Sequence, residues 1–264
     1  MFQWLLKKVV GKTKRKKRDS SLYFSLGAKK DLQDRRDYTF SYAPGVSQLP
    51  EEYEIPALPP IRNQGSIGAC ASFAAVGAVE IQLLNKNPRR FLEGSELYHY
   101  YNTRLYVNKE LPLDGGQSIR DACKCLDKYH MALEYAWPYN PSRFNEEPPF
   151  WAYMVSGAYK IERYERLVNI EQVKEALSRN MPVMFGLELK NSFRNLNAKN
   201  PIYIPTDGVW GNHAMLLVGY SNLKKTFTVR NCWGPGWGLN GYCKVSYDTF
   251  LKDSFDWWIV EIKG

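Results

Sequence analysis

Long apolar runs, paired cysteines and metal-type spacings are all missing from this 264-residue sequence. No stretch of 18 apolar residues occurs, so we expect no transmembrane helix. Five cysteines is an odd number, and no exported-protein leader is apparent. We therefore expect free thiols in a reducing compartment rather than a disulfide framework. Cys123 and Cys125 form a C-x-C on an expected helix, where their sulfurs would point about 200° apart. Zinc sites use other spacings, so we expect no metal and no cofactor.

Acidic residues are absent from the first 18 positions, which hold eight of the 36 lysines and arginines. The formal net charge of +9 therefore belongs to a tail, since the rest of the chain has 28 basic and 27 acidic residues. The tail has its apolar residues before its charges, the reverse of a secretory signal peptide. Its alternatives are a solvated terminus, a short helix on an acidic membrane or on the surface of a partner such as an import partner, and a nuclear or nucleic-acid address at 14–18. The nearly neutral body argues against a nucleic-acid-binding function.

The expected elements are helices first and strands later. A proline-rich extended segment at 44–64 precedes a helix that starts near residue 69, ends at N-K-N-P and is apolar nearly all round, which indicates burial. Further helices are expected at 94–106, 117–129 and 169–179. Short β-branched or aromatic stretches predict strands at 183–189, 213–220, 226–231, 241–247 and 256–262. Hydrophobic residues make up 44% of the chain, enough for a core, and this order predicts an α+β protein with two segregated halves.

Cys70 ends the stretch N-Q-G-S-I-G-A-C, directly before the buried helix. A lone cysteine is more often a core residue than a reactive one, but a helix N-terminus favours a thiolate. A neighbouring imidazolium would favour it further. His99 lies within a tyrosine-rich helix and His130 follows a helix end, so each has a structural explanation. His213 opens a strand after a glycine turn, where its ring would be both fixed and accessible, and we predict that it is the base.

Three more residues complete a candidate constellation. Asn231, in R-N-C-W-G-P-G-W-G, could hold the imidazole in one tautomer without adding a charge, and Trp233 could shield that contact from water. Gln64, six residues before the cysteine, could donate a side-chain N–H to a developing oxyanion. The backbone N–H of Cys70 could supply a second donor. The ordered set of glutamine, cysteine, histidine and asparagine carries more information than any one member.

These stretches resemble the papain-like (C1) cysteine peptidases, of microbial or viral type. The matching residues are 63–70, 211–220 and 230–242, and D-R-R-D-Y at 34–38 resembles a segment found upstream of the domain in microbial members. The resemblance implies a papain-like α+β fold, in which a helical half and an antiparallel β-barrel-like half enclose the active-site cleft. It also implies peptide-bond hydrolysis through an acyl-enzyme thioester.

The resemblance assigns a role to each matching residue. Cys70 would be the nucleophile, His213 the acid and base, Asn231 the orienter and Gln64 the oxyanion donor. Gly115 and Gly116 match the family's glycine pair, which would hold an extended substrate as an added strand, and Trp233 would lie beside them in substrate binding.

The resemblance also implies a domain organisation. Residues 1–45 would be a basic N-terminal extension, either a targeting segment or a pro-segment, and residues 46–264 the peptidase domain. Its helical half would span about 64–140 and its β half about 150–262, with the termini crossing over. A full inhibitory propeptide is not evident. Ile67 and Leu113 stand where the family commonly has a disulfide, consistent with a reducing compartment, and Cys232 replaces a usual serine.

The leading hypothesis is therefore a thiol endopeptidase. The alternatives are a proteolytically silent peptide-binding module and an acyltransferase on the same scaffold. We expect a polypeptide substrate, no nucleic acid required by the domain, and a monomer. We expect an intracellular location or delivery with a virion or as an effector.

Overall fold

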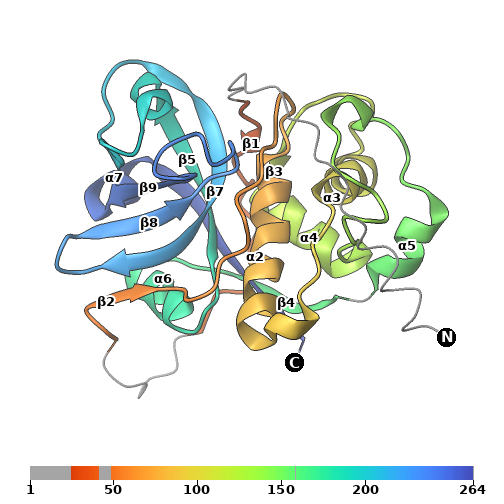
Figure 1. The fold of residues 1–264 in the computed structure, drawn as a ribbon, viewed down its shortest axis with the longest axis horizontal. Helices are drawn as coiled ribbons and strands as arrows, with labels where there is room; N and C mark the ends of the chain where they lie inside the picture. The colour runs from red at the N-terminus through yellow and green to blue at the C-terminus, as the bar shows by residue number, and fades with distance from the viewer. Residues whose placement is uncertain (1–24, 42–48, 158, 264) are drawn as a thin grey trace.

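The computed structural model describes residues 25–41, 49–157 and 159–263, which form two halves on either side of one helix. This helix, α2 (Cys70–Lys86), stands at the centre of Figure 1, with a group of helices on one side and most of the sheet on the other. Its sequence is rich in alanine and almost all of its residues are buried, as the sequence analysis predicts. No helix in these ranges has both the length and the hydropathy needed to cross a bilayer.

The helical half consists of short helices packed against α2. They are α3 (Glu96–Asn102), the π-helical turn η2 (Thr103–Asn108), α4 (Ile119–Tyr129), α5 (Phe150–Ser156) and the 3-10 turns η1 (Pro88–Arg90) and η3 (Pro141–Arg143). Serine side chains begin two of them: the Ser95 hydroxyl accepts the Tyr98 amide, and the Ser118 hydroxyl accepts the Asp121 amide. The expected helices at 94–106 and 117–129 are thus confirmed, the first with a π-helical end.

The β half is one mixed sheet. Its strands follow the order β4 (Ile161–Arg166), β10 (Ser254–Ile262), β5 (Val183–Lys190), β7 (Val209–Ser221), β8 (Thr226–Arg230), β9 (Tyr242–Ser246) and β6 (Ile202–Tyr203), with β2 (Glu52–Glu54) beside β7. All pairs are antiparallel except β6 with β9. Helices α6 (Ile170–Ser178) and α7 (Tyr247–Asp253) and the turn η4 (Asn191–Asn195) complete this half. The α+β class is confirmed; over the described residues the sheet is open, with ends at β4 and β6.

Some elements carry no clear sequence pattern. Strand β4 reads I-E-R-Y-E-R and α5 reads F-W-A-Y-M-V-S, so neither shows the alternation or helical period on which a prediction would rest. Strand β4 forms because β10 pairs with it along its whole length and its outer residues face solvent. Tertiary pairing decides this segment rather than local preference.

An N-terminal strap, residues 25–31, crosses the seam between the halves. Its strand β1 (Ala28–Lys29) pairs in parallel with β3 (Gln117–Ser118), near the N-terminal end of α2 in Figure 1. The strap ends at Asp31, whose buried carboxylate accepts the Trp258 indole N–H at 2.7 Å and the Arg120 amide at 3.2 Å. Of the predicted extension 1–45, residues 1–24 and 42–45 lie outside the described residues, so the alternatives for the basic tail stay predictions.

A cluster of charges is buried where the two halves meet. Arg62 lies 2.5 Å from a carboxylate oxygen of Glu80 and 2.7 Å from one of Glu96, and both carboxylates are buried. Burial, opposed by Arg62 and reinforced by Glu80 and Glu134, raises the pKa of Glu96. Burial likewise raises the pKa of Glu134 to about 7. One arginine thus faces three carboxylates, and the cluster favours retaining protons.

This cluster predicts a pH dependence of stability that Glu96→Gln reduces. A carboxyl group whose pKa is raised on folding stabilises the protein most at low pH, and that contribution is lost as the pH rises through the folded pKa. Between pH 5 and pH 8 the unmodified protein should lose on the order of 1–2 kcal/mol more unfolding free energy than Glu96→Gln. Urea unfolding at the two pH values measures this difference. Identical losses in the two proteins would contradict the role given to Glu96.

Candidate active site

Cys70 is the first residue of α2, and its position depends on the loop before it. The Gly68 amide donates to the Asp114 carboxylate at 3.0 Å, and Gly65 adopts a left-handed φ of +66° that favours glycine. The Cys70 sulfur is buried and accepts the backbone N–H of Ala214 on β7 at 3.5 Å. The thiol of the helical half thus contacts the strand that carries His213.

His213 is held in one tautomer by Asn231. The ring Nε2 lies 2.8 Å from the Asn231 Oδ1, and because an amide oxygen only accepts, Nε2 carries the proton. The other nitrogen, Nδ1, is buried and has no hydrogen-bond partner among the described residues, so it is free to take a proton. Trp233 stacks on the imidazole with ring centroids 4.6 Å apart.

Burial acts on the pKa values of both Cys70 and His213. Burial raises the pKa of the Cys70 thiol to about 11, although the amide of Ala214 and other nearby backbone N–H groups oppose the shift. Burial lowers the pKa of His213 to about 4, and the bond to Asn231 offsets only part of that effect. Burial thus opposes the charged form of each group, and any opening of the site to water would favour their ionisation.

Gln64 lies in the same site, fully buried. Its Oε1 accepts the Cys232 thiol at 2.8 Å, and this contact turns the amide so that Nε2 donates elsewhere. Nε2 donates to the carbonyl oxygens of Ile67 at 2.9 Å and Ser25 at 3.2 Å. The cysteine that replaces the family's usual serine is therefore a neighbour of the predicted oxyanion donor.

The N-terminal strap covers this constellation. Besides its contact with Gln64, the Ser25 carbonyl oxygen accepts the Trp233 indole N–H at 3.4 Å. Gly27 lies directly over the site: its N–H interacts with the Cys70 sulfur, and its carbonyl oxygen accepts the Gln117 amide at 2.8 Å. A Cβ on Gly27 would overlap the backbone of Gly68, so only glycine fits there.

The predicted glycine pair lies against the strap. Gly116 has a left-handed φ of +71°, and a Cβ at this position would overlap the Gly27 backbone. Gly115 stands one residue further away, beside the side chains of Glu110 and Lys29. The pair therefore leaves room for an extended chain along β3, and in this structure the occupant of that room is the strap.

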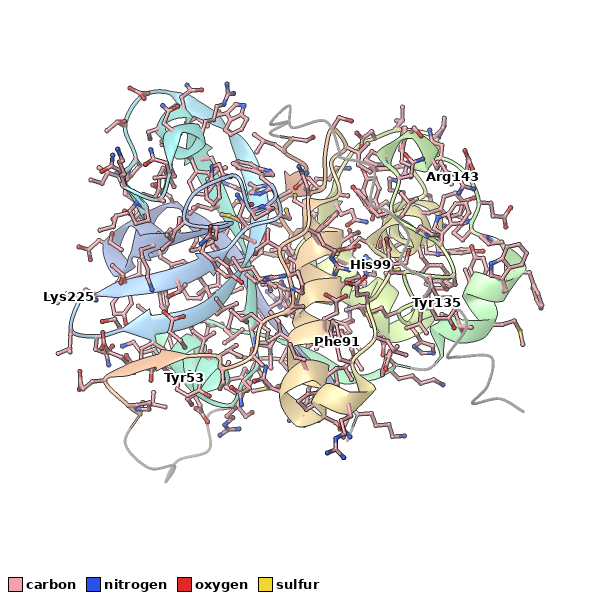
Figure 2. All side chains as sticks on the ribbon, in the orientation of Figure 1. Tyr53, Phe91, His99, Tyr135, Arg143 and Lys225 are labelled. Atoms are coloured by element: carbon pink, nitrogen blue, oxygen red, sulfur yellow. The ribbon has the colours of Figure 1, made fainter. Side chains whose placement is uncertain are left out.

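The remaining histidines and cysteines lie elsewhere. His99 is buried inside the helical half (Figure 2), where Nδ1 contacts the Ser72 hydroxyl at 2.8 Å and Nε2 contacts the Ala122 carbonyl at 3.0 Å. His130 has a left-handed backbone just past α4. Cys123 and Cys125 are buried free thiols. In the described ranges no group of histidines, cysteines and acids could hold a metal.

The strap is the part of the site that the sequence analysis misses. Residues 25–31 read S-L-G-A-K-K-D, with no period and no known motif. Their structure comes from contacts with β3 and with residues far along the chain, which no local pattern encodes. The one local signal is Gly27 within a mixed-charge stretch.

The chain is similar to several known proteins. A family model described as papain family cysteine protease matches residues 50–252. An uncharacterized peptidase C1-like protein of Acanthamoeba polyphaga mimivirus is 29% identical over 265 residues, which cover 95% of this chain and 85% of that protein. Cathepsin S of Bos taurus is 28% identical over 72% of this chain, and the match covers only 56% of that protein. The crystal structure of xylellain, a cysteine protease from Xylella fastidiosa, has a TM-score of 0.82 and 28% identity, covering 93% of this chain and 98% of that one.

The covered thiol predicts slow alkylation at neutral pH that Gly27→Ala accelerates. The added methyl group collides with the backbone of Gly68, so the strap must leave, and water can then lower the pKa of Cys70. We expect the alkylation rate of Cys70 by iodoacetamide at pH 7 to rise at least tenfold in Gly27→Ala. Peptide mapping by mass spectrometry would identify the labelled cysteine among the five.

Gly208→Ala is the matched control. A Cβ at Gly208 would meet no atom within 4 Å, so the same substitution there should leave the rate unchanged. Equal rates in Gly27→Ala and the unmodified protein would mean that the strap does not protect the thiol.

Proposed function

The chain belongs to the papain family of cysteine proteases, and from that premise we propose that Cys70, His213 and Asn231 are its catalytic residues. As a member of this family it is a thiol peptidase, a hydrolase that acts on polypeptides. One observation carries the assignment of residues: the hydrogen bond of 2.8 Å from His213 Nε2 to Asn231. It leaves Nδ1 without a partner among the described residues, while the amide of the next residue, Ala214, contacts the Cys70 sulfur. That arrangement suits a general base whose ring is oriented through Nε2 and which accepts the proton at Nδ1.

The proposed reaction has two steps. The His213 Nδ1 takes the proton of the Cys70 thiol, and the sulfur attacks the carbonyl carbon of a peptide bond. The negative oxygen of the tetrahedral intermediate accepts hydrogen bonds from the Gln64 side chain and the Cys70 amide. The C–N bond then breaks, the imidazolium gives its proton to the leaving amine, and a thioester remains. Water, deprotonated by His213, attacks the thioester and releases the carboxylic acid and the thiol.

Substrate would bind along the glycine pair. Gly116 supports this proposal because its lack of a side chain lets another backbone approach closely, as Gly27 of the strap does. Gly115 and Trp233 flank the same path, one beside β3 and the other over the imidazole. An extended peptide would form backbone hydrogen bonds there as an added strand.

We further propose that the strap keeps the enzyme latent. Its Ser25 carbonyl uses the Gln64 amide that an oxyanion would need, and Gly27 lies on the thiol. A peptide cannot reach the cysteine until residues 25–28 move. Burial opposes the charged forms of Cys70 and His213, which fits an enzyme at rest.

The proposed setting is a reducing compartment. All five cysteines lie in the described ranges as buried free thiols, which fits an intracellular location or delivery with a virion or as an effector. We propose a monomer without a need for nucleic acid. For the basic tail at 1–18 we propose contact with an acidic membrane or an import partner.

Substitutions of the proposed catalytic residues should have unequal effects on peptide hydrolysis, measured in the Gly27→Ala background so that the cleft is open. Cys70→Ala should abolish turnover, because Cys70 supplies the attacking sulfur. His213→Ala should nearly abolish it, because His213 transfers the protons. Gln64→Ala should lower kcat by about 10²–10³ through loss of an oxyanion donor. Asn231→Ala should have a smaller effect than Cys70→Ala, since Asn231 only orients the imidazole.

Full activity of Cys70→Ala would contradict the assignment of Cys70 as the nucleophile. Tight binding of peptides by the Cys70 protein without any hydrolysis would instead favour the silent binding module. Transfer of the acyl group to an added amine in preference to water would favour the acyltransferase.

The latency proposal has its own test. Gly27→Ala should hydrolyse a peptide substrate at least tenfold faster than the unmodified chain, and Gly208→Ala should match the unmodified chain. A synthetic peptide with the strap sequence S-L-G-A-K-K-D should inhibit Gly27→Ala competitively, because it can refill the cleft. Latency is excluded if the unmodified chain and Gly27→Ala have the same kcat/KM.

A further inference from the structure

The strap carries two lysines whose side chains point to opposite walls of the site. In β1 successive residues face opposite ways, so Ala28 is buried whereas Lys29 points outward, and Lys30 follows directly after the strand. The Lys30 ammonium lies 5.2 Å from the ring centre of Phe255 on the β half. The Lys29 ammonium lies 2.8 and 2.7 Å from the two carboxylate oxygens of Glu110 on the helical half. Glu110 therefore binds the ammonium group of a lysine from the segment that occupies the cleft, which in this structure is the strap.

Glu110 is held next to the glycine pair by its own loop. Its amide donates to the Arg104 carbonyl at 2.9 Å, and its carbonyl accepts the Leu113 amide at 2.8 Å. A Cβ on Gly115 would lie 2.8 Å from a carboxylate oxygen of Glu110 and 3.3 Å from the Lys29 ammonium. The missing side chain at Gly115 thus lets both charges lie against the backbone edge where a substrate would bind.

Neighbouring cations are already engaged. The buried guanidinium of Arg104 donates to the carbonyl oxygens of Leu113 and Phe144 and to the Asn145 side chain. Lys29 is the cation that lies within ion-pair distance of Glu110 in the part of the chain that the structure describes. When the strap leaves, Glu110 loses this partner while its side chain, 34% exposed, remains at the edge of the cleft.

We propose that Glu110 is a specificity-determining residue, which selects peptide substrates with a lysine or arginine side chain at the position beside Gly115. The strap then occupies the cleft with the same kind of side chain that the enzyme accepts from a substrate. This inference rests on the proposed peptidase function. Its chemistry is an ion pair at a partly solvated edge, so it discriminates between charges at one subsite and leaves the other subsites unrestricted.

Charge reversal of both partners tests the proposal. All enzymes carry Gly27→Ala to open the cleft, and the substrates are peptides that differ only in one residue, placed as Lys, Arg, Ala or Glu at successive positions on both sides of the scissile bond. At one position Lys and Arg should raise kcat/KM about three- to tenfold over Ala, an effect that weakens with added salt. Glu110→Gln should remove that preference, and Glu110→Lys should reverse it in favour of the Glu peptide.

Glu261→Gln is the matched control. Glu261 is 33% exposed and forms an ion pair of 2.6 Å with Arg163 between β10 and β4, away from the strap. This variant should keep the preference for Lys and Arg. Equal preferences in Glu110→Gln and the enzyme with Glu110 would overturn the proposal and leave Glu110 as a partner of the strap alone.

Binding separates this inference from the proposed function. If no peptide is hydrolysed, the peptidase assignment fails, and the inference is then judged by fluorescence anisotropy on a Cys70→Ala, Gly27→Ala protein. Labelled Lys peptides should bind about three- to tenfold more tightly than Glu peptides, and adding Glu110→Lys should reverse the order. Equal affinities in that measurement would overturn the inference by itself.

Discussion

The contact between the Cys70 sulfur and the Ala214 amide joins the two halves of this protein at the candidate active site. The partners lie 144 residues apart, one at the start of α2 and the other on β7. The helix can lie close to the sheet because its inner face is made of small residues; a Cβ on Gly77, for example, would reach 3.1 Å from a Leu216 methyl group. Larger side chains on this face would push α2 away from β7 and separate the thiol from the imidazole.

Local sequence patterns predict the parts of the site that are fixed by their own elements. Cys70 starts a helix, His213 lies on a strand and Asn231 follows one, so each could be placed from nearby residues. The buried charges at the seam have a weaker signal, namely the acidic Glu80 in an otherwise apolar helix. Its partner Arg62 comes from the extended segment before the helix and could not be paired with it from the sequence.

Other parts depend on contacts across the whole fold. The strap has no preference of its own, and its conformation follows from β3 and from the pocket that receives Asp31. Strand β4 likewise depends on β10. In both cases the partner strand determines the structure, and a single sequence does not reveal which distant segments meet. The same limit applies to Glu110, because its proposed role in specificity is inferred from its ion pair with Lys29, which the sequence does not reveal.

The chain is anchored at Asp31, where the strap ends, and again at Phe40 beyond it, and these two anchors have a consequence for regulation. The Phe40 amide donates to the Arg166 carbonyl at 2.8 Å, so the chain beyond the strap stays attached to the edge of the sheet even if residues 25–28 detach. A tethered occupant has an effective concentration in the millimolar range or above, which does not fall when the protein is diluted. Substrate peptides therefore always compete with the strap for the cleft. Lasting exposure of the cleft requires that the chain be cleaved between the strap and Phe40, or that the strap bind at another place.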